Sequence, residues 1–473
     1  MRVIIAFLND FSFLSEMFEE LGQLIISVSD GIWGTPILIL LLGGGFYFLV
    51  YSRLVPLRYI GHALKILTGK YDDPNEAGQL RHYQALSTAL AGTVGMGNVS
   101  GVAVAITMGG PGAIFWMWVS ALLGVSTKFF TCSLAVMFRG KDSAGEIQGG
   151  PMYYITEGLG RNWKPVAVFF AVMAMVGVSP LFQANQLTQM IRDVLLVPNN
   201  IPVSFGSDLV TGIVISIIVG IVVIGGIKRI GNVTGSLVPT MVVVYTVTVL
   251  YIIFSHPAHI IPAFQTIFED AFTGDAVLGG AVGAVIITGV RRAAFSNEAG
   301  LGTAPMAHGA AKTNEPIREG LVAMLGPIID TIIVCTMTAL ALIITDTWLI
   351  SNADGITLTA QAFDSAIPGV GKYILVVCVI FFSMSTMFAF PYYGVKCLGF
   401  VAGAKYQHLY NYVFVLVIIV GAVSNLRVII GLIDIAFALM AFPTVISTIL
   451  LSPHVKRASI DYFARLKLEK NRK

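Results

Sequence analysis

Charged residues are scarce in this chain of 473 residues, because Lys, Arg, Asp and Glu together make up only 12% of it. Soluble domains carry about a quarter charged residues. Hydrophobic residues make up 56%, and the mean hydropathy is +0.82. Stretches such as PILILLLGGGFYFLVY approach the roughly 20 apolar residues that a bilayer-spanning helix needs. The composition therefore excludes a soluble protein and predicts an all-α polytopic membrane protein.

Cysteine is also rare, and all the cysteines lie in apolar stretches, which argues against a disulfide framework. They are Cys132, Cys335, Cys378 and Cys397. His, Cys and acidic residues are not grouped at the spacing of a transition-metal site or of a catalytic centre. The sequence therefore predicts no enzyme, and it contains no soluble domain or basic surface that would bind nucleic acid.

Apolar windows between charged or Pro/Gly-rich breaks predict eleven transmembrane helices. Their centres lie near residues 43, 97, 125, 178, 218, 244, 295, 333, 385, 415 and 440. Residues 1–30 include apolar and acidic residues at helical spacing, which predicts a helix at the membrane interface. The positive-inside rule places the basic loop 53–82 and the basic tail 453–473 in the cytoplasm. We therefore expect a multi-pass protein of the cell inner (plasma) membrane, with its N-terminus outside.

Two predicted spans carry a glycine pair where a buried helix would carry leucine. The span at about 85–110 contains Gly95-Met96-Gly97, and the span at about 277–312 contains Gly300-Leu301-Gly302. These spans lie five apart and cross in opposite directions, which indicates a transporter built from two inverted five-helix repeats with broken first helices. The predicted repeats are residues 85–254 and 276–452, and residues 31–55 form an additional N-terminal span.

These glycines also match two other patterns. Gly97 and Gly101 have the spacing of a helix-packing motif, which would be the favoured reading for a single segment. Because two corresponding segments both carry such glycines together with polar residues, the broken-helix interpretation is favoured over helix packing. A nucleotide-binding loop is excluded, because no third glycine completes the motif and no soluble strand–helix unit surrounds it.

An unwound helix at mid-membrane must line a protein cavity, because lipid cannot satisfy its backbone groups. Its freed amides favour a carboxylate and its freed carbonyls favour a cation. Thr93 and Asn98 place side-chain oxygens beside the first break. Hydroxyls in membrane helices usually bond their own backbone. Opposite the first break, however, Ser383, Ser385 and Thr386 would complete an oxygen cage for Na⁺.

Four charged residues fall at membrane depth, where such residues are functional candidates by default. They are Lys128, Asp330, and Arg291 and Arg292 near Glu298. The alternative is a structural ion pair or a side chain that reaches the interface. Glu298 lies beside the second break and is the candidate for gating or proton coupling. His308 is interpreted as a packing residue.

The stretches GTVGMGNVSGVAVAITMGGPGAIFWMWVSALLG, GGPMYYI, QAN and FSNEAGLGTAPMAHGAAK resemble the alanine or glycine:cation symporter family, also called sodium:alanine symporters. The resemblance runs from about residue 86 to 343 and continues more weakly to about 400. It implies a leucine-transporter-type fold, whose core is a pair of inverted repeats.

The resemblance also implies roles for individual residues. Gly95, Met96, Gly97 and Asn98 match the segment that meets the carboxylate of the amino acid, Gln183 matches a polar pocket residue, and Phe295 matches an aromatic wall. Ser385 and Thr386 match a Ser-Thr pair that would ligate sodium together with the carbonyls of Ala91, Val94 and Phe382. These carbonyl assignments rest on fold analogy.

One position departs from the family pattern. Phe390 stands where the family usually has tryptophan, and Pro391 follows it. A smaller aromatic residue enlarges the pocket, so we expect a substrate slightly larger than alanine or an altered ranking of alanine and glycine. Pro391 is expected to bend or break its helix.

The leading prediction is a sodium-coupled symporter that imports a small neutral amino acid, alanine or glycine, by alternating access. A proton-coupled transporter with Glu298 in the coupling role is the nearer alternative. A channel is less favoured, because channels usually rely on oligomeric symmetry whereas this single chain has two predicted halves. The expected partners are the amino acid, Na⁺ as the coupling ion and the bilayer, and the protein is expected to be a monomer.

Overall fold

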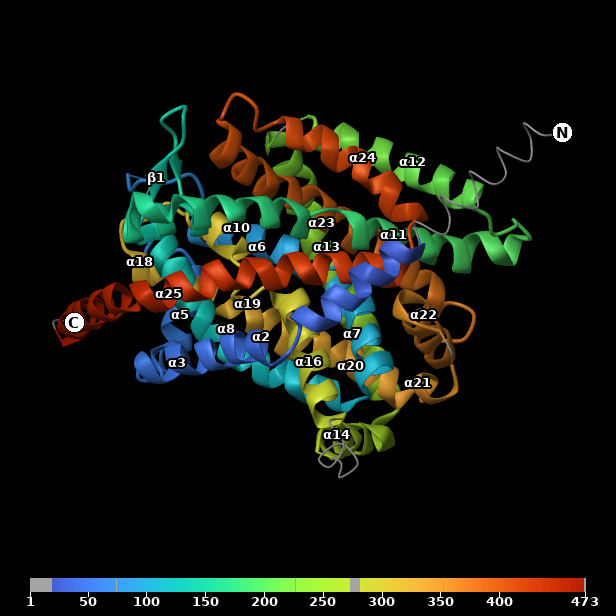
Figure 1. Ribbon diagram of the computed structural model, residues 1–473. Helices are drawn as coiled ribbons and strands as arrows, with labels where there is room; N and C mark the ends of the chain where they lie inside the picture. The colour runs from blue at the N-terminus through green and yellow to red at the C-terminus, as the bar shows by residue number, and fades with distance from the viewer. Residues whose placement is uncertain (1–18, 74, 226, 273–280, 352, 472–473) are drawn as a thin grey trace.

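The computed structural model describes residues 19–73, 75–225, 227–272, 281–351 and 353–471. The structure is 81% helical, and its helices pack around the long helices α8 (Gly112–Met137), α23 (Gly371–Ala402) and α25 (Leu426–Asn471) (Figure 1). Within the described residues the only strands are β1 (Gly140–Lys141) and β2 (Ile147–Gln148), which pair as a short antiparallel hairpin. The predicted helical membrane fold is therefore confirmed, apart from this hairpin.

By length and composition, six helical segments of the described chain are able to span a bilayer, or up to nine if each of three bent helix pairs is one span. The six are Gly112–Met137 (α8), Arg161–Asn199, Phe205–Val223 (α12), Pro316–Ile344, Gly371–Ala402 (α23) and Leu426–Leu468, which lies within α25 (Leu426–Asn471). A polytopic protein is thus confirmed. The number eleven and the inverted repeats stay predictions.

Two of these segments are interrupted helices. The first comprises η3 (Arg161–Trp163), α10 (Lys164–Gly177), α11 (Leu181–Ile191), η4 (Arg192–Leu196) and η5 (Val197–Asn199). The second comprises α18 (Pro316–Ala323), α19 (Leu325–Pro327), the π-helical η6 (Ile328–Cys335) and α20 (Thr336–Ile344). Pro180 separates α10 from α11, because proline has no N–H to continue the ladder.

The N-terminal part of the described chain forms a bent pair. Its helices are Glu19–Ile32 and Thr35–Tyr51, bent by 51°. The second helix of the pair comprises α2 (Thr35–Leu38), η1 (Ile39–Gly43) and α3 (Gly44–Tyr51). Two short helices follow it, α4 (Val55–Arg58) and α5 (Ile60–Leu67). The first 18 residues of the predicted interfacial helix, the start of the second predicted repeat and the last two residues of the tail lie outside the described residues. The predicted domain boundaries remain predictions.

The remaining helices complete the bundle. They are α6 (His82–Thr93), α7 (Met96–Gly109), α9 (Pro151–Tyr153), η2 (Tyr154–Gly158), α13 (Ile227–Ser255), α14 (Pro257–Ala271), α16 (Ala281–Asn297), α17 (Thr303–His308), α21 (Thr347–Ile350), α22 (Gly355–Ala366) and α24 (Leu409–Val423). The break expected at Pro391 is absent, because α23 continues through it to Ala402. Neighbouring helices can accommodate such a proline within a membrane bundle.

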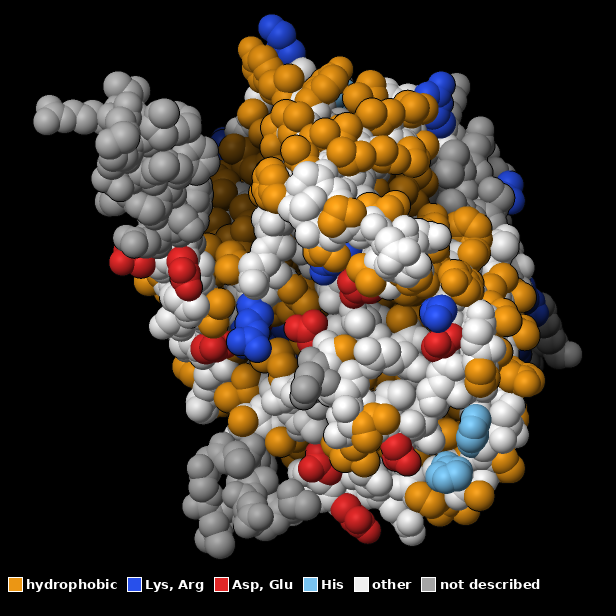
Figure 2. Space-filling view, turned by 90° about the vertical axis from the view of Figure 1, so that its right-hand side faces the viewer, with side chains coloured by type: hydrophobic (Ala, Val, Ile, Leu, Met, Phe, Trp, Pro, Cys, Tyr) orange, Lys and Arg blue, Asp and Glu red, His pale blue; other side chains and the backbone are white. Residues whose placement is uncertain are grey.

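The core lies around α8, which packs against α16, α18 and α3. In α8, 78% of the most apolar window is buried, compared with 33% in α12. Apolar side chains on α12 and α24 are exposed, among them Ile217, Ile221, Leu416 and Val420. Figure 2 shows this apolar cover on the upper part of the molecule, with charged side chains on the face below. Such a distribution suits a rim that faces lipid.

Candidate functional site

The first predicted break lies between α6 and α7, which are bent by 42°. Val94 and Gly95 leave the helical conformation there. The Gly95 amide donates to Asn98 Oδ1 at 2.8 Å, which caps α7. A Cβ on Gly95 would lie 2.5 Å from Thr386 Oγ1, so only glycine allows this approach. The glycine therefore brings the break directly against α23.

The second break separates α16 from α17. Glu298, Gly300 and Gly302 all have positive φ, at 54°, 87° and 96°. For a residue that is not glycine this conformation is uncommon. Glu298 is 2% exposed, and its Oε2 accepts a hydrogen bond from Thr303 Oγ1 at the start of α17. A buried carboxylate thus occupies the break itself.

The two breaks lie against each other. A Cβ on Gly97 would lie 3.3 Å from Phe295 Cδ1, so the start of α7 packs on the end of α16. Asp330 of η6 joins the two helices, because Asn98 Nδ2 donates to its Oδ1 at 2.8 Å and Ser296 Oγ donates to its Oδ2 at 2.5 Å. The carboxylate is fully buried. Asp330 is therefore a common anchor for both broken helices.

A narrow cavity of about 10 Å³, room for about one water molecule, lies beside the breaks. It is lined by Gly92, Thr93, Met96, Gly97, Gly177, Ser179, Gln183, Phe295, Glu298, Thr386, Phe390, Ile433 and Phe437. Most of the predicted substrate residues thus surround one space, together with Glu298. Gly95 and Asn98 do not line it. Asn98 instead uses its side-chain amide to hold Gly95 and Asp330.

Several of the oxygens predicted to bind a cation gather where α23 faces the first break. Thr386 Oγ1 lies 3.2 Å from the Phe382 carbonyl and 3.5 Å from the Ala91 carbonyl. Ser385 Oγ donates to the same Phe382 carbonyl at 3.0 Å. Val94 is buried within the break itself, next to this group. Neutral oxygens from two helices are the type of ligand expected for a hard cation.

Comparison with known proteins places this geometry in a family. A family model described as the sodium:alanine symporter family matches residues 18–473. The chain belongs to this family. It is 40% identical to an uncharacterized transporter of Haemophilus influenzae over 453 residues, covering 94% of this chain and 97% of the relative.

Two further relatives carry functional names. The sodium/alanine symporter AgcS of Methanococcus maripaludis is 40% identical over 439 residues, covering 91% of this chain and 94% of the relative. The putative sodium/proton-dependent alanine carrier protein YrbD of Bacillus subtilis is 33% identical over 464 residues, covering 93% and 92% respectively. As a member of a symporter family, the protein is a transporter and not an enzyme.

Sequence patterns did not predict five of the residues that line the cavity of this symporter. They are Gly92, Gly177, Ser179, Ile433 and Phe437. Ser179 precedes the proline between α10 and α11, and that interruption was the local signal available. Ser179 Oγ and Gln183 Oε1 are buried without a hydrogen-bond partner among the described residues. Since buried polar atoms are normally paired, both are suited to contact a bound solute.

Arg291 and Arg292, two of the basic residues predicted at membrane depth, form ion pairs, which is the structural alternative for them. Arg291 Nε lies 2.5 Å from Asp434 Oδ2 of α25, and Arg292 contacts the same oxygen. Arg291 also pairs with Asp30 at 2.9 Å. Lys128 is 2% exposed and interacts electrostatically with Glu298 and Asp330. The carboxylate of Asp434 thus pairs with both arginines at the end of α16.

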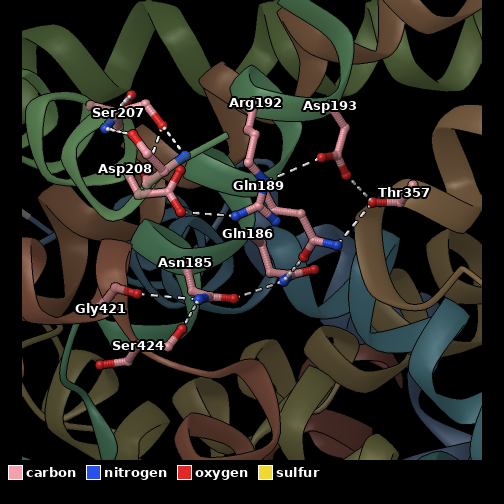
Figure 3. Close-up of polar contacts among 12 residues, drawn as sticks. Asn185, Gln186, Gln189, Arg192, Asp193, Ser207, Asp208, Thr357, Gly421 and Ser424 are labelled. Atoms are coloured by element: carbon pink, nitrogen blue, oxygen red, sulfur yellow. Dashed lines mark hydrogen bonds and ion pairs between the residues drawn. The ribbon is translucent and has the colours of Figure 1, made fainter. Parts of the chain in front are cut away.

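A chain of polar side chains follows α11 beyond the cavity (Figure 3). Gln186 Nε2 donates to Asn185 Oδ1 and to Gln189 Oε1, at 3.0 and 2.8 Å. Gln189 Nε2 then donates to Thr357 Oγ1 of α22 at 2.9 Å. The Thr357 hydroxyl in turn donates to Asp193 Oδ2 at 2.5 Å. This network fastens α22 to α11, the helix that also carries Gln183.

Proposed function

We propose that the protein imports alanine or glycine together with Na⁺ by alternating access. The observation that carries the proposal is the meeting of two broken helices at one small cavity, directly beside Thr386 and the Ala91 and Phe382 carbonyls. The names of AgcS and YrbD, both of which mention alanine and sodium, support the same substrate and ion.

The cavity offers separate surfaces to each part of an amino acid. The amides of Met96 and Gly97 lie in the first turn of α7, where backbone N–H groups have no partner within the helix and favour a carboxylate. Gln183 Oε1 is a free acceptor for the ammonium group. Phe295 and Phe390 leave little room for a side chain. These contacts match the chemistry of a small neutral amino acid, and the cavity of about 10 Å³ has to widen to admit one.

Coupling follows from the position of the proposed sodium site. Na⁺ held between the Ala91 carbonyl and Thr386 would fix the end of α6, and the start of α7 would then receive the carboxylate in the right geometry. Binding of each solute thus favours binding of the other. Each Na⁺ that enters gains about 2.3 kcal/mol per 100 mV of membrane potential. We infer a monomer in the plasma membrane, with the N-terminus outside and the tail in the cytoplasm.

Proton coupling is the second candidate, and Glu298 favours it. Its carboxylate is buried and lines the same cavity. A proton delivered there would neutralise a charge within the break. The name of YrbD includes protons as well as sodium. Under this alternative, a pH gradient would drive uptake without Na⁺.

The test is uptake of labelled alanine into proteoliposomes, with an inward sodium gradient or with choline in its place at constant pH. We expect accumulation with sodium only. Thr386→Ala should abolish it, whereas the control Thr248→Ala should not, because among the described residues the Thr248 hydroxyl donates to Val244 O of its own helix. Equal accumulation with a pH gradient and no sodium, lost in Glu298→Gln, would instead support proton coupling.

A further inference from the structure

Two backbone segments pair at the end of the molecule where the tail of α25 contacts α18. Residues 77–82 lead into α6, and residues 308–313 follow α17. Leu80 and Ala311 form a parallel β-bridge. Further bonds run from Gln79 N and Leu80 N to Ala310 O (2.8 and 3.0 Å) and from Thr313 N to Ala77 O (3.1 Å). A Cβ on Gly78 would lie 2.2 Å from Ala311 O, so the two backbones lie in direct contact.

Arg139 reinforces this pairing from the end of α8. Its guanidinium group donates to four carbonyls that belong to the two segments. They are Gly309 O (2.8 Å, from Nε), Thr313 O (2.8 Å) and Ala77 O (3.2 Å, both from Nη1), and Ala311 O (from Nη2). The planar guanidinium group presents several fixed donors and is well suited to such a contact. One side chain therefore ties both segments to α8.

Glu319 of α18 completes the connection. His82, the first residue of α6, contacts its Oε2 through Nδ1, and His308, the last residue of α17, contacts its Oε1 through Nδ1 at 2.5 Å. All three side chains are at most 1% exposed. Hydrogen bonds to a buried charge are stronger than those between neutral groups. A single carboxylate thus holds the outer ends of both half-helices.

We propose that Glu319 is a positioning residue for transport, and that it and Arg139 fasten α6 and α17 into one body with α8 and α18. We call this connection the clasp: residues 77–82 and 308–313 with Arg139 and Glu319. The half-helices then stay together throughout the cycle, and this end of the molecule opens between that body and α23. The inference rests on the proposed alternating access.

The polar contacts within the clasp outnumber those between α17 and α23, which supports an opening between α17 and α23. The clasp combines a backbone bridge, four guanidinium bonds and two imidazole–carboxylate bonds. Between α17 and α23 the polar contacts of the described residues are Lys396 Nζ to Met306 O at 3.2 Å and the Cys397 thiol to Met306 Sδ at 3.7 Å. Separation at the second boundary breaks far fewer bonds, so an opening motion will follow it.

The test uses disulfides placed at the two boundaries. Leu80→Cys with Ala311→Cys joins the paired segments within the clasp, and we expect the oxidised protein to keep most of its sodium-driven uptake. Met306→Cys beside the native Cys397 joins α17 to α23, and we expect oxidation to stop uptake and reduction to restore it. Wild type treated with the same oxidant is the control for the four native cysteines.

Loss of uptake in the oxidised Leu80/Ala311 pair, reversed by reduction, would overturn the proposal, because the segments would then have to separate. So would failure of that disulfide to form, since bridged residues lie within reach of one. The assay uses whichever neutral amino acid the wild type accumulates. A substrate other than alanine therefore contradicts the proposed function and leaves the test of the clasp intact.

A second measurement addresses Glu319 directly. Glu319→Gln accepts from one histidine but presents an N–H to the other, so we expect uptake to fall about tenfold through misplacement of the half-helices. Forming the Leu80/Ala311 disulfide in that variant should restore most of the rate. A loss that the disulfide does not relieve, in protein that elutes as folded, argues against a positioning role. Glu315→Gln, which alters an ion pair with Arg465, is the matched control.

Discussion

The side-chain amide of Asn98 lies 2.8 Å from Asp330 Oδ1, although 232 residues separate the two in the sequence. The same amide accepts from Gly95, while Asp330 accepts from Ser296 at the end of the other broken helix. One buried carboxylate therefore fixes the relative position of both breaks. We therefore expect loss of this link to alter the cavity beside the breaks.

Replacing Asp330 by Asn should weaken alanine transport. An amide in place of the carboxylate removes one acceptor and points an N–H group at Asn98 or Ser296. Since a hydrogen bond to a charged group contributes about 1.5–3 kcal/mol, we expect the KM for alanine to rise about tenfold or more. Initial rates in proteoliposomes measure this. Asp364→Asn is the control, because its partner Lys372 lies at the surface, 3.3 Å away. An unchanged KM in folded protein would contradict the link.

Gly95→Ala should disrupt the proposed sodium site. The added Cβ would lie 2.5 Å from Thr386 Oγ1, which must turn away from the Ala91 carbonyl. We expect the sodium concentration for half-maximal uptake to rise about tenfold, equivalent to about 1.4 kcal/mol of lost binding. Gly101→Ala is the matched control on the same helix, since its nearest contact would be at 3.8 Å. Equal sodium dependence in both variants would place the ion elsewhere.

Local features of the sequence were enough to predict the two breaks, because glycine pairs in an apolar helix act through backbone conformation alone. The pairing of Arg291 with Asp434 was not predictable, since it depends on packing between helices 143 residues apart. Ser179 and Phe437 were missed for the same reason. The predicted break at Pro391 is absent because α23 continues through it, and the predicted bend there stays a prediction. Asn98 was expected to face the substrate, but its partners at Gly95 and Asp330 occupy its amide.

Gln183→Leu should raise the KM for alanine about tenfold. Gln183 lines the cavity and its Oε1 has no partner among the described residues, so a bound ammonium group would donate a hydrogen bond to it. Losing a polar contact to a charged group costs about 1.5–3 kcal/mol. Thr188→Val on the same helix is the control, because the Thr188 hydroxyl is also buried without a partner but does not line the cavity. If the two substitutions have equal effects, Gln183 does not meet the substrate.

Asp434→Asn should destabilise the protein more than it alters substrate ranking. Both Arg291 and Arg292 contact the same carboxylate oxygen, and Asp434 is fully buried. Breaking a buried ion pair by removing one partner costs about 3–5 kcal/mol. We expect the thermal midpoint in detergent to fall by several degrees. The exposed Asp461, also on α25, offers a control in Asp461→Asn, and an equal midpoint for both variants would argue against a stabilising pair.

Phe390→Trp should shift the preference of the transporter from alanine towards glycine. The ring of Phe390 lines the cavity and is 4% exposed, so a larger indole has to take up space that the substrate side chain occupies. One methylene in such a pocket changes discrimination by about 1–3 kcal/mol, so the ratio of kcat/KM for glycine over alanine should rise about tenfold. Competition uptake of glycine, alanine and serine measures it. Phe381→Trp, outside the cavity on the same helix, is the control and should leave the substrate ranking unchanged. An unchanged ranking in Phe390→Trp would show that Phe390 does not determine substrate preference.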